Sequence, residues 1–230
     1  MTLLTDTTLA TLRREILSGT LPAGTKLAEA PVAKRLGVSR VPVREALAVL
    51  ANEGLVQLKE TGRSFVKSLS LNDFEEVYAM RLLLEPAGAR LAASSLGAHI
   101  SALRQNIRQT SKAATVAEVT QLDLDFHELI LKAAGNSRLL RSWRTLRPEL
   151  QLWLGGLHRQ REILLHNVRP KTVSAHSLLL ERLKSGSPEE CETLMKEHIL
   201  GWKQWIPREE PATHTDSSSK SRRKPTPSAH

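Results

Sequence analysis

Four side chains in the second half of the chain have the types and the spacing of a metal site. Asp123 and His127 are four residues apart, so on a helix both side chains point from one face. His176 and His198 lie on two later segments of helical periodicity, and antiparallel packing of these helices would bring all four side chains together. Three imidazoles and one carboxylate suit a borderline divalent ion such as Zn²⁺, Ni²⁺ or Mn²⁺, and the sequence does not choose among these metals. Asp125 is a competing ligand, but it lies two residues before His127 and faces away from it.

The elements that must position these side chains are helices. Between residues 69 and 206 apolar residues recur at helical spacing, and Gly97, Gly135-Asn136 and Gly186-Ser187-Pro188 interrupt them. This region is expected to form an all-α bundle, with a first helix from about Ser70 to Ala93 and later helices over 98–113, 116–134, 137–158, 161–185 and 188–204. Residues 207–230 are rich in Pro, Ser and charge, so we expect a disordered basic tail.

Residues 1–68 show a different pattern, in which short helices precede a hairpin. Apolar spacing and glycine stops predict helices over 5–18, 29–36 and 40–52, followed by strands over 55–59 and 64–67. The whole chain is therefore expected to be mainly α, with an N-terminal winged helix-turn-helix that includes a small β-hairpin and a C-terminal all-α bundle.

The turn between the second and third of these helices has the features of a helix-turn-helix. Gly37 can take the positive φ that a tight turn between helices needs, and the Ser39 oxygen is expected to cap the next helix. Pro42 is tolerated in the first helical turn, where a missing N–H costs little. Burial of the apolar stripe leaves one end of the helix exposed to the major groove, with Arg40, Val41 and Arg44 available to bases or phosphates.

Composition and charge agree with a nucleic-acid partner. The chain of 230 residues has a net charge of +9, and residues 1–68 hold ten Lys and Arg against six Asp and Glu. The single cysteine allows no internal disulfide, which fits a reducing compartment. The N-terminus has no continuous apolar stretch of a signal peptide, and no apolar run reaches the length of a membrane span. We therefore expect a cytoplasmic protein.

The N-terminal segment closely resembles the winged helix-turn-helix of the GntR family. The matching residues are Leu21-Pro22-Ala23-Gly24, Leu36-Gly37-Val38-Ser39-Arg40, Pro42-Val43-Arg44-Glu45-Ala46-Leu47 and Glu53-Gly54-Leu55-Val56. The resemblance implies that the operator is faced by Ser39, Arg40, Val41, Pro42 and Arg44. It also implies that Thr61 and Gly62 form the tip of the wing, which reaches the minor groove. Where some members carry an Arg at the start of the second helix, this chain has Ala30, which puts one phosphate contact in doubt.

The later region resembles the FCD domain of the FadR subfamily of GntR regulators, an all-helical ligand-binding domain. The matching residues are Arg81-Leu82-Leu83-Leu84-Glu85, Leu122-Asp123-Leu124-Asp125-Phe126-His127, Ala134-Gly135-Asn136, His176 and His198. The four candidate ligands fall on this family's metal-binding pattern. We expect the effector to be a small organic acid bound at the metal, because open coordination positions accept a carboxylate oxygen. Arg81 is the first candidate for gripping that carboxylate, and Arg147 is the second.

The expected function is that of a ligand-responsive, DNA-binding transcription regulator, a repressor, which acts as a homodimer because one recognition helix reads only a few base pairs. Two other functions use the same features. A metal-dependent enzyme acting on small carboxylates would activate water at an open metal position, but no Glu or His stands out as its general base. An architectural DNA-binding protein would need no effector, but buried histidines are a poor choice for a purely structural core.

Overall fold

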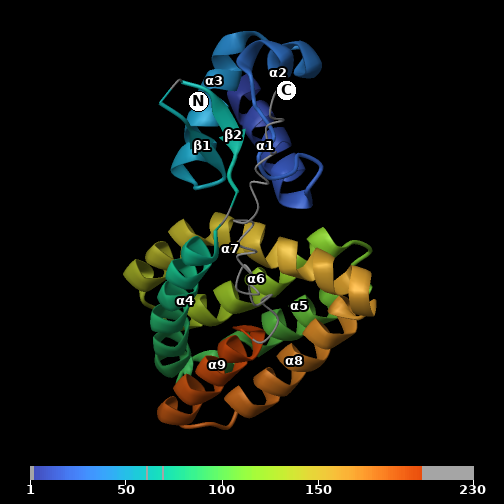
Figure 1. Ribbon diagram of the computed structural model, residues 1–230. Helices are drawn as coiled ribbons and strands as arrows, with labels where there is room; N and C mark the ends of the chain where they lie inside the picture. The colour runs from blue at the N-terminus through green and yellow to red at the C-terminus, as the bar shows by residue number, and fades with distance from the viewer. Residues whose placement is uncertain (1–2, 61, 69, 204–230) are drawn as a thin grey trace, which may run out of the picture.

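The computed structural model describes residues 3–60, 62–68 and 70–203, which fold into a small N-terminal part and a larger helical part (Figure 1). The N-terminal part contains α1 (Leu3–Ser18), α2 (Glu29–Leu36), α3 (Arg40–Asn52), β1 (Val56–Leu58) and β2 (Ser64–Val66). The strands pair antiparallel, with Val56 opposite Val66. The expected helices and hairpin are thus confirmed, with shorter strands than predicted. Thr61 at the expected wing tip and the expected tail over 207–230 lie outside the described residues.

The turn between α2 and α3 follows the sequence pattern in one respect and departs from it in two. Gly37 has a φ of 67°, in the left-handed region that the tight turn requires. Ser39 occupies the N-cap position of α3, but its hydroxyl accepts no N–H of that described helix, so the expected cap does not form. Pro42 is buried together with Val43 and Ala46, on the face of α3 that packs into the core. Its side chain is therefore not offered to the operator.

The helical part is a bundle, as predicted, but with one boundary displaced. Its elements are α4 (Leu71–Ala92), the 3₁₀ turn η1 (Leu96–His99), α5 (Ile100–Lys112), α6 (Val116–Ala133), α7 (Ser137–Leu165), α8 (Val168–Leu183) and α9 (Pro188–Lys203). The predicted break between residues 158 and 161 is wrong, because α7 continues to Leu165 and ends where His166 turns left-handed at φ 48°. Neither Gly nor Pro interrupts the chain from His158 to Leu165. None of the described helices combines the length and the apolar composition that a membrane crossing requires.

The apolar core is divided between the two parts of the molecule. One cluster lies in the N-terminal part, where α1, α3 and the strands bury side chains such as Leu12 and Leu50. The helical part has a main cluster that includes Phe126 and Ile199, and a second cluster around the fully buried Trp143 of α7. Each part therefore has a core of its own.

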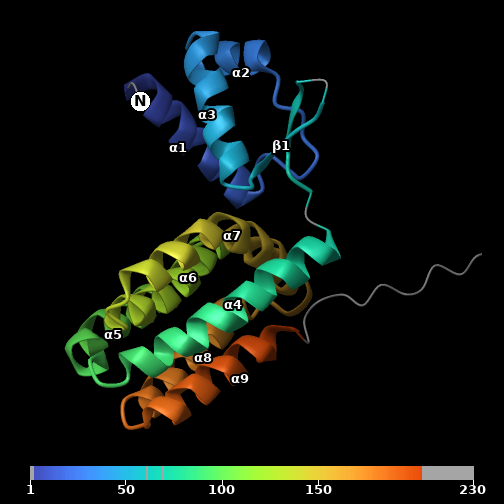
Figure 2. The ribbon, with the colours of Figure 1, turned by 90° about the vertical axis from the view of Figure 1, so that its left-hand side faces the viewer.

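Helix α7 is one element of the bundle that meets the N-terminal part (Figures 1 and 2). Leu152 of α7 packs against the N-terminal core. Arg159, two turns later, donates a hydrogen bond of 3.2 Å to the carbonyl oxygen of Leu17 at the end of α1. Lys67, just after β2, donates to Glu149 of α7 at 3.0 Å. A displacement of α7 therefore acts on both α1 and the end of the hairpin.

Candidate metal centre and nucleic-acid interface

His127 of α6, His176 of α8 and His198 of α9 meet inside the helical part. One ring nitrogen of each histidine lies within 4.8 Å of a ring nitrogen of the other two, and the ring centroids are 5.2 to 5.4 Å apart. His127 and His176 are buried, and His198 is partly buried. Phe126 stacks on the ring of His176 with 4.0 Å between centroids, which restricts the orientation of that imidazole. Three of the residues expected as ligands are thus brought to one place by three separate helices.

Asp123 adds a carboxylate to this cluster from one turn earlier on α6. Its Oδ1 lies 3.2 Å from Nε2 of His176. Several buried polar atoms of this cluster have no hydrogen-bond partner among the described residues. They are both carboxylate oxygens of Asp123, both ring nitrogens of His176, and Nε2 of His198. Because buried polar atoms are almost always paired, a group of unpaired electron donors that face one another fits a site that holds a cation. A donor set of three imidazoles and one carboxylate would suit a divalent ion such as Zn²⁺, Ni²⁺ or Mn²⁺.

The electrostatics of the cluster favour the protonation states that metal ligands need. Burial lowers the pKa of His176 and lowers the pKa of His198 well below its usual value, because a charged imidazolium is poorly solvated there. Burial alone would raise the pKa of Asp123, but the adjacent His176, followed by His127, outweighs burial and holds that pKa well below its usual value. An ionised carboxylate beside neutral imidazoles is the combination that binds a divalent cation.

Glu85 of α4 belongs to this site, although the sequence analysis gave it no role. Its Oε1 accepts hydrogen bonds from Nε of Arg81 at 2.7 Å and from Nε1 of Trp143 at 2.8 Å. Its Oε2 lies 2.7 Å from Nδ1 of His127, although the ring N–H is not well aligned with that oxygen. Burial opposes its ionisation, but the charge of Arg81 and then the adjacent His127 lower the pKa of Glu85 to about 2. The signal that could have identified Glu85 is its position four residues after Arg81, within a run of leucines.

Arg81, expected from the sequence to bind an anion, lies against the candidate metal ligands. Its Nη2 is 3.0 Å from Nε2 of His127, and its side chain is only 1% exposed. A guanidinium can only donate, so Nε2 of His127 is the acceptor and the ring proton is on Nδ1, toward Glu85. Burial alone would lower the pKa of Arg81, but the charges of Glu85 and then Asp123 raise it. Arg81 is therefore a buried, permanent cation beside the candidate ligands.

Arg147, the second expected effector residue, is directed elsewhere. It is bonded to Asp125 at 2.5 Å and also to Glu128, two acidic residues of α6. These lie on a different face of α6 from the candidate ligands Asp123 and His127. Among the described residues, Arg147 thus forms no ion pair with the candidate metal ligands.

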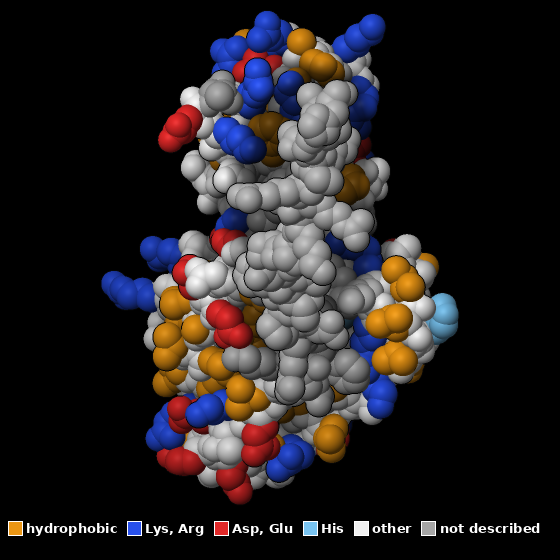
Figure 3. Space-filling view, in the orientation of Figure 1, with side chains coloured by type: hydrophobic (Ala, Val, Ile, Leu, Met, Phe, Trp, Pro, Cys, Tyr) orange, Lys and Arg blue, Asp and Glu red, His pale blue; other side chains and the backbone are white. Residues whose placement is uncertain are grey.

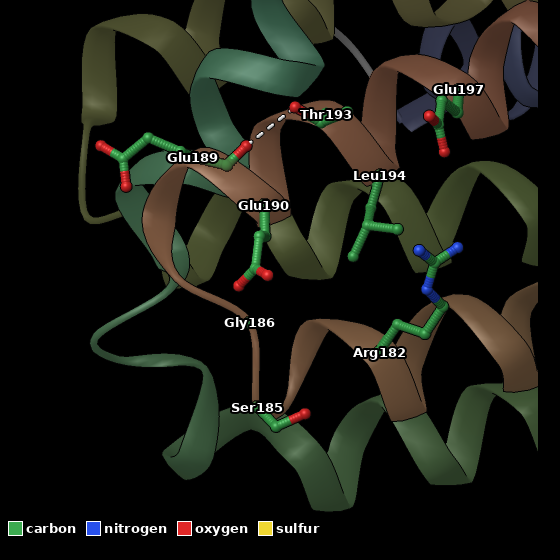
Figure 4. A pocket seen from close by; sticks show the side chains of 8 residues that line it. All are labelled: Arg182, Ser185, Gly186, Glu189, Glu190, Thr193, Leu194 and Glu197. Atoms are coloured by element: carbon green, nitrogen blue, oxygen red, sulfur yellow. Dashed lines mark hydrogen bonds between the residues drawn. The ribbon is translucent and has the colours of Figure 1, made fainter.

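A surface hollow at the C-terminal helices is separate from this cluster. It has a volume of about 430 Å³, lies at the turn between α8 and α9, and is lined by residues that include Arg182, Glu189, Glu190 and Glu197 (Figure 4). In Figure 4 the side chains of Glu189, Glu190 and Glu197 point in different directions, and the Thr193 hydroxyl bonds to the backbone oxygen of Glu189 on the same helix. An open hollow with several carboxylates does not suit an organic acid.

The expected DNA-reading residues lie at the exposed start of α3. The side chains of Arg40 and Arg44 are 63% and 65% exposed, and Val41 is 59% exposed. Both arginines are bonded to Glu29, the first residue of α2. Figure 3 shows Lys and Arg side chains gathered over the end of the N-terminal part that is farthest from the bundle. Gly62 of the expected wing is exposed, with a φ of 70°.

Two family descriptions match the chain. Residues 4–66 match the family described as "Bacterial regulatory proteins, gntR family", and residues 76–201 match the "FCD domain". The chain is 30% identical over 207 residues to a "Probable D-xylose utilization operon transcriptional repressor" of Paenarthrobacter nicotinovorans, which covers 86% of this chain and 89% of the relative. It is 29% identical over 178 residues to the "Gluconate operon transcriptional repressor" of Bacillus subtilis, which covers 76% of this chain and 73% of the relative.

Solved structures share the fold. The E. coli protein McbR/YncC aligns with a TM-score of 0.69 and 20% identity, over 90% of this chain and all of that one. A GntR transcriptional regulator from Rhodococcus sp. RHA1 aligns with a TM-score of 0.70 and 24% identity, over 87% of this chain and 95% of that one. The two relatives are named as transcriptional repressors rather than enzymes, which agrees with the expectation from the sequence.

Proposed function

This chain belongs to the GntR family of bacterial regulatory proteins and carries an FCD domain, and on that premise we propose that it is a transcriptional repressor controlled by a small organic acid. The acid binds in the helical part, at a divalent metal ion held by Asp123, His127, His176 and His198. The observation that carries the proposal is the convergence of three histidines from three helices beside a buried, unpaired aspartate. A metal ion held there would offer open coordination positions to a carboxylate oxygen.

Arg81 is the residue that we propose for the second contact with the acid. It is a buried cation 3.0 Å from Nε2 of His127, and Glu85 engages its Nε atom. When Nε2 of His127 binds the metal, Nη2 of Arg81 has to give up its contact with that nitrogen. The N–H groups of its guanidinium that Glu85 does not engage would suit a carboxylate. Arg147 would have to leave Asp125 and Glu128 to reach the same acid, so Arg81 is the better candidate.

The contacts that connect the candidate metal ligands to the DNA-binding part pass through α7. Trp143 of α7 donates to Glu85, which in turn contacts Arg81 and His127. Farther along the same helix, Leu152 and Arg159 contact the N-terminal part. Binding of the acid changes DNA affinity only if it favours one arrangement of these contacts over another.

The repressor is proposed to bind its operator as a homodimer, with Arg40 and Arg44 of each copy in the major groove. Two symmetric recognition helices provide the affinity that one cannot. The outer face of α4 supports pairing of two copies, because Met80, Leu83 and Leu91 are 40%, 67% and 47% exposed along one helix.

The test measures binding of the protein to a duplex from the upstream region of its own gene and to a random duplex of equal length. Each is titrated with metal-loaded and chelator-treated protein, with and without a panel of hydroxy acids, sugar acids and dicarboxylates. Gluconate is included because one relative is named for the gluconate operon. We expect a strong preference for the upstream duplex and at least one acid that changes this affinity about fivefold or more, only in metal-loaded protein. Binding of a neutral apolar ligand alone, unaffected by metal removal, would contradict the proposal.

A further inference from the structure

Glu29 holds both arginines that are expected to read the operator. It is the first residue of α2 and lies across the turn from the start of α3. Arg44 grips it with two bonds, from Nε at 2.7 Å and from Nη2 at 2.9 Å. Arg40 approaches the same carboxylate with Nε at 3.3 Å and Nη2 at 3.2 Å. The Glu29 side chain is 24% exposed, whereas the side chains of Arg40 and Arg44 are 63% and 65% exposed.

This arrangement leaves one particular edge of each guanidinium open. Both arginines use their side edge, formed by Nε and Nη2, to contact Glu29. The end-on edge, formed by Nη1 and the second N–H of Nη2, faces away from that carboxylate. Two parallel N–H groups on such an edge can bond guanine O6 and N7 together. The side chains are therefore already oriented before DNA arrives.

The carboxylate also reduces the positive charge that this end of α3 presents. Two arginines and one glutamate carry a net charge of +1 rather than +2. Affinity for arbitrary DNA depends on cationic charge near phosphates, whereas affinity for an operator also depends on fixed donor geometry. One carboxylate can therefore weaken binding to wrong sequences while it supports binding to the right one.

We infer that Glu29 is a positioning residue that sets sequence specificity, because it orients Arg40 and Arg44 for end-on base contacts and lowers their attraction to arbitrary DNA. The inference rests on the proposed function, in which these arginines read an operator.

The test uses the full chain and compares affinities for the upstream duplex and a random duplex over a series of salt concentrations. Glu29→Gln removes the charge, and Glu29→Asp keeps the charge but is too short to hold both arginines. Glu53→Gln is the matched control, because Glu53 is also bonded twice by one arginine, Arg13, at the opposite end of α3. The melting temperature of each variant is recorded. If Glu29→Gln melts at a lower temperature than the wild type, the comparison rests on Glu29→Asp.

We expect both Glu29 variants to lower the ratio of specific to random affinity by about tenfold, whereas Glu53→Gln leaves it within about twofold. Only Glu29→Gln should steepen the salt dependence of random binding, by up to about one phosphate contact. With Arg40 and Arg44 both changed to Ala, Glu29→Gln should no longer alter the ratio. If both Glu29 variants keep the wild-type ratio of specific to random affinity, the inference about Glu29 is overturned, but the proposed function is not. If the wild type shows no preference for the upstream duplex, the proposed function fails with it.

Discussion

The Nδ1 atom of His127 lies 2.7 Å from Oε2 of Glu85, and both side chains are completely buried. One comes from α6 and the other from α4, so this contact ties the candidate metal ligand to a different helix. A carboxylate on one ring nitrogen of a histidine orients the other nitrogen and makes it a better electron donor. Glu85 also accepts from Trp143 of α7, which links the candidate metal ligands to a helix that meets the N-terminal part.

Glu85→Gln should weaken metal binding while leaving all four candidate ligands in place. We expect the affinity for Zn²⁺ to fall roughly 10- to 100-fold, as for other residues that orient metal-bound histidines. The free energy of unfolding should fall by about 3 kcal/mol, because Arg81 would keep a buried charge without its partner. Calorimetric titration and chemical denaturation measure the two effects. Glu76→Gln, at an exposed position of the same helix, is the control. Equal Zn²⁺ affinity in wild type and Glu85→Gln would exclude this role.

Purified protein should contain about one divalent metal ion per chain, and His176→Ala should lose it. The three remaining ligands cannot hold the ion as tightly, and metal binding contributes to folding stability. Elemental analysis and the melting shift on addition of Zn²⁺, Ni²⁺ or Mn²⁺ test this prediction. His99→Ala serves as the control, because His99 lies outside the cluster. Metal-free wild type that shows no melting shift with any of the three ions would refute the prediction.

Arg40→Ala and Arg44→Ala should each weaken binding to the upstream duplex by roughly 1–3 kcal/mol if the side chain reads a base. The reason is the loss of a bidentate contact at the exposed start of α3. Gel shifts at one fixed salt concentration measure the effect. Arg90→Ala removes an equally charged arginine that is paired with Glu189 on α9, and it should leave DNA affinity unchanged. Unaltered DNA affinity in both variants would contradict the assignment of α3 as the helix that binds in the major groove.

Asp73 at the start of α4 should make the fold sensitive to acid. Hydrogen bonds from the Ser70 hydroxyl, the Ser70 N–H and then Lys67 lower the pKa of Asp73 from 3.8 to about 2. Because the folded-state pKa is the lower one, these bonds stabilise the fold above a pH of about 4, and their contribution is lost as the pH falls toward about 2. Asp73→Ala should therefore cost about 1 kcal/mol of unfolding free energy at pH 7 and progressively less below pH 4.

Urea denaturation between pH 7 and pH 2.5 measures this difference. Glu76→Ala on the same helix should change stability little at either pH, since its side chain is exposed. A cost of Asp73→Ala that stays constant across the range would show that the carboxylate charge contributes nothing to the cap.

The sequence determined the character of each element and much of the site. Apolar spacing located the helices, and the glycine before Val38 predicted the turn that exposes Arg40 and Arg44. The four-residue interval between Asp123 and His127 was enough to place both on one face of α6, because helical geometry is local. Resemblance to the FCD domain then added His176 and His198 as expected partners.

Only the tertiary structure decided which faces meet. It made Glu85 the link between Arg81, Trp143 and His127, although Trp143 is 58 positions away in sequence. It paired Arg147 with Asp125 rather than with the histidines, and it buried the side chain of Pro42 in the core. Periodicity states which side of a helix is apolar, but not which other helix lies against it or at what rotation. Those quantities depend on the packing of all the helices together, so polar contacts across the bundle were absent from the local pattern.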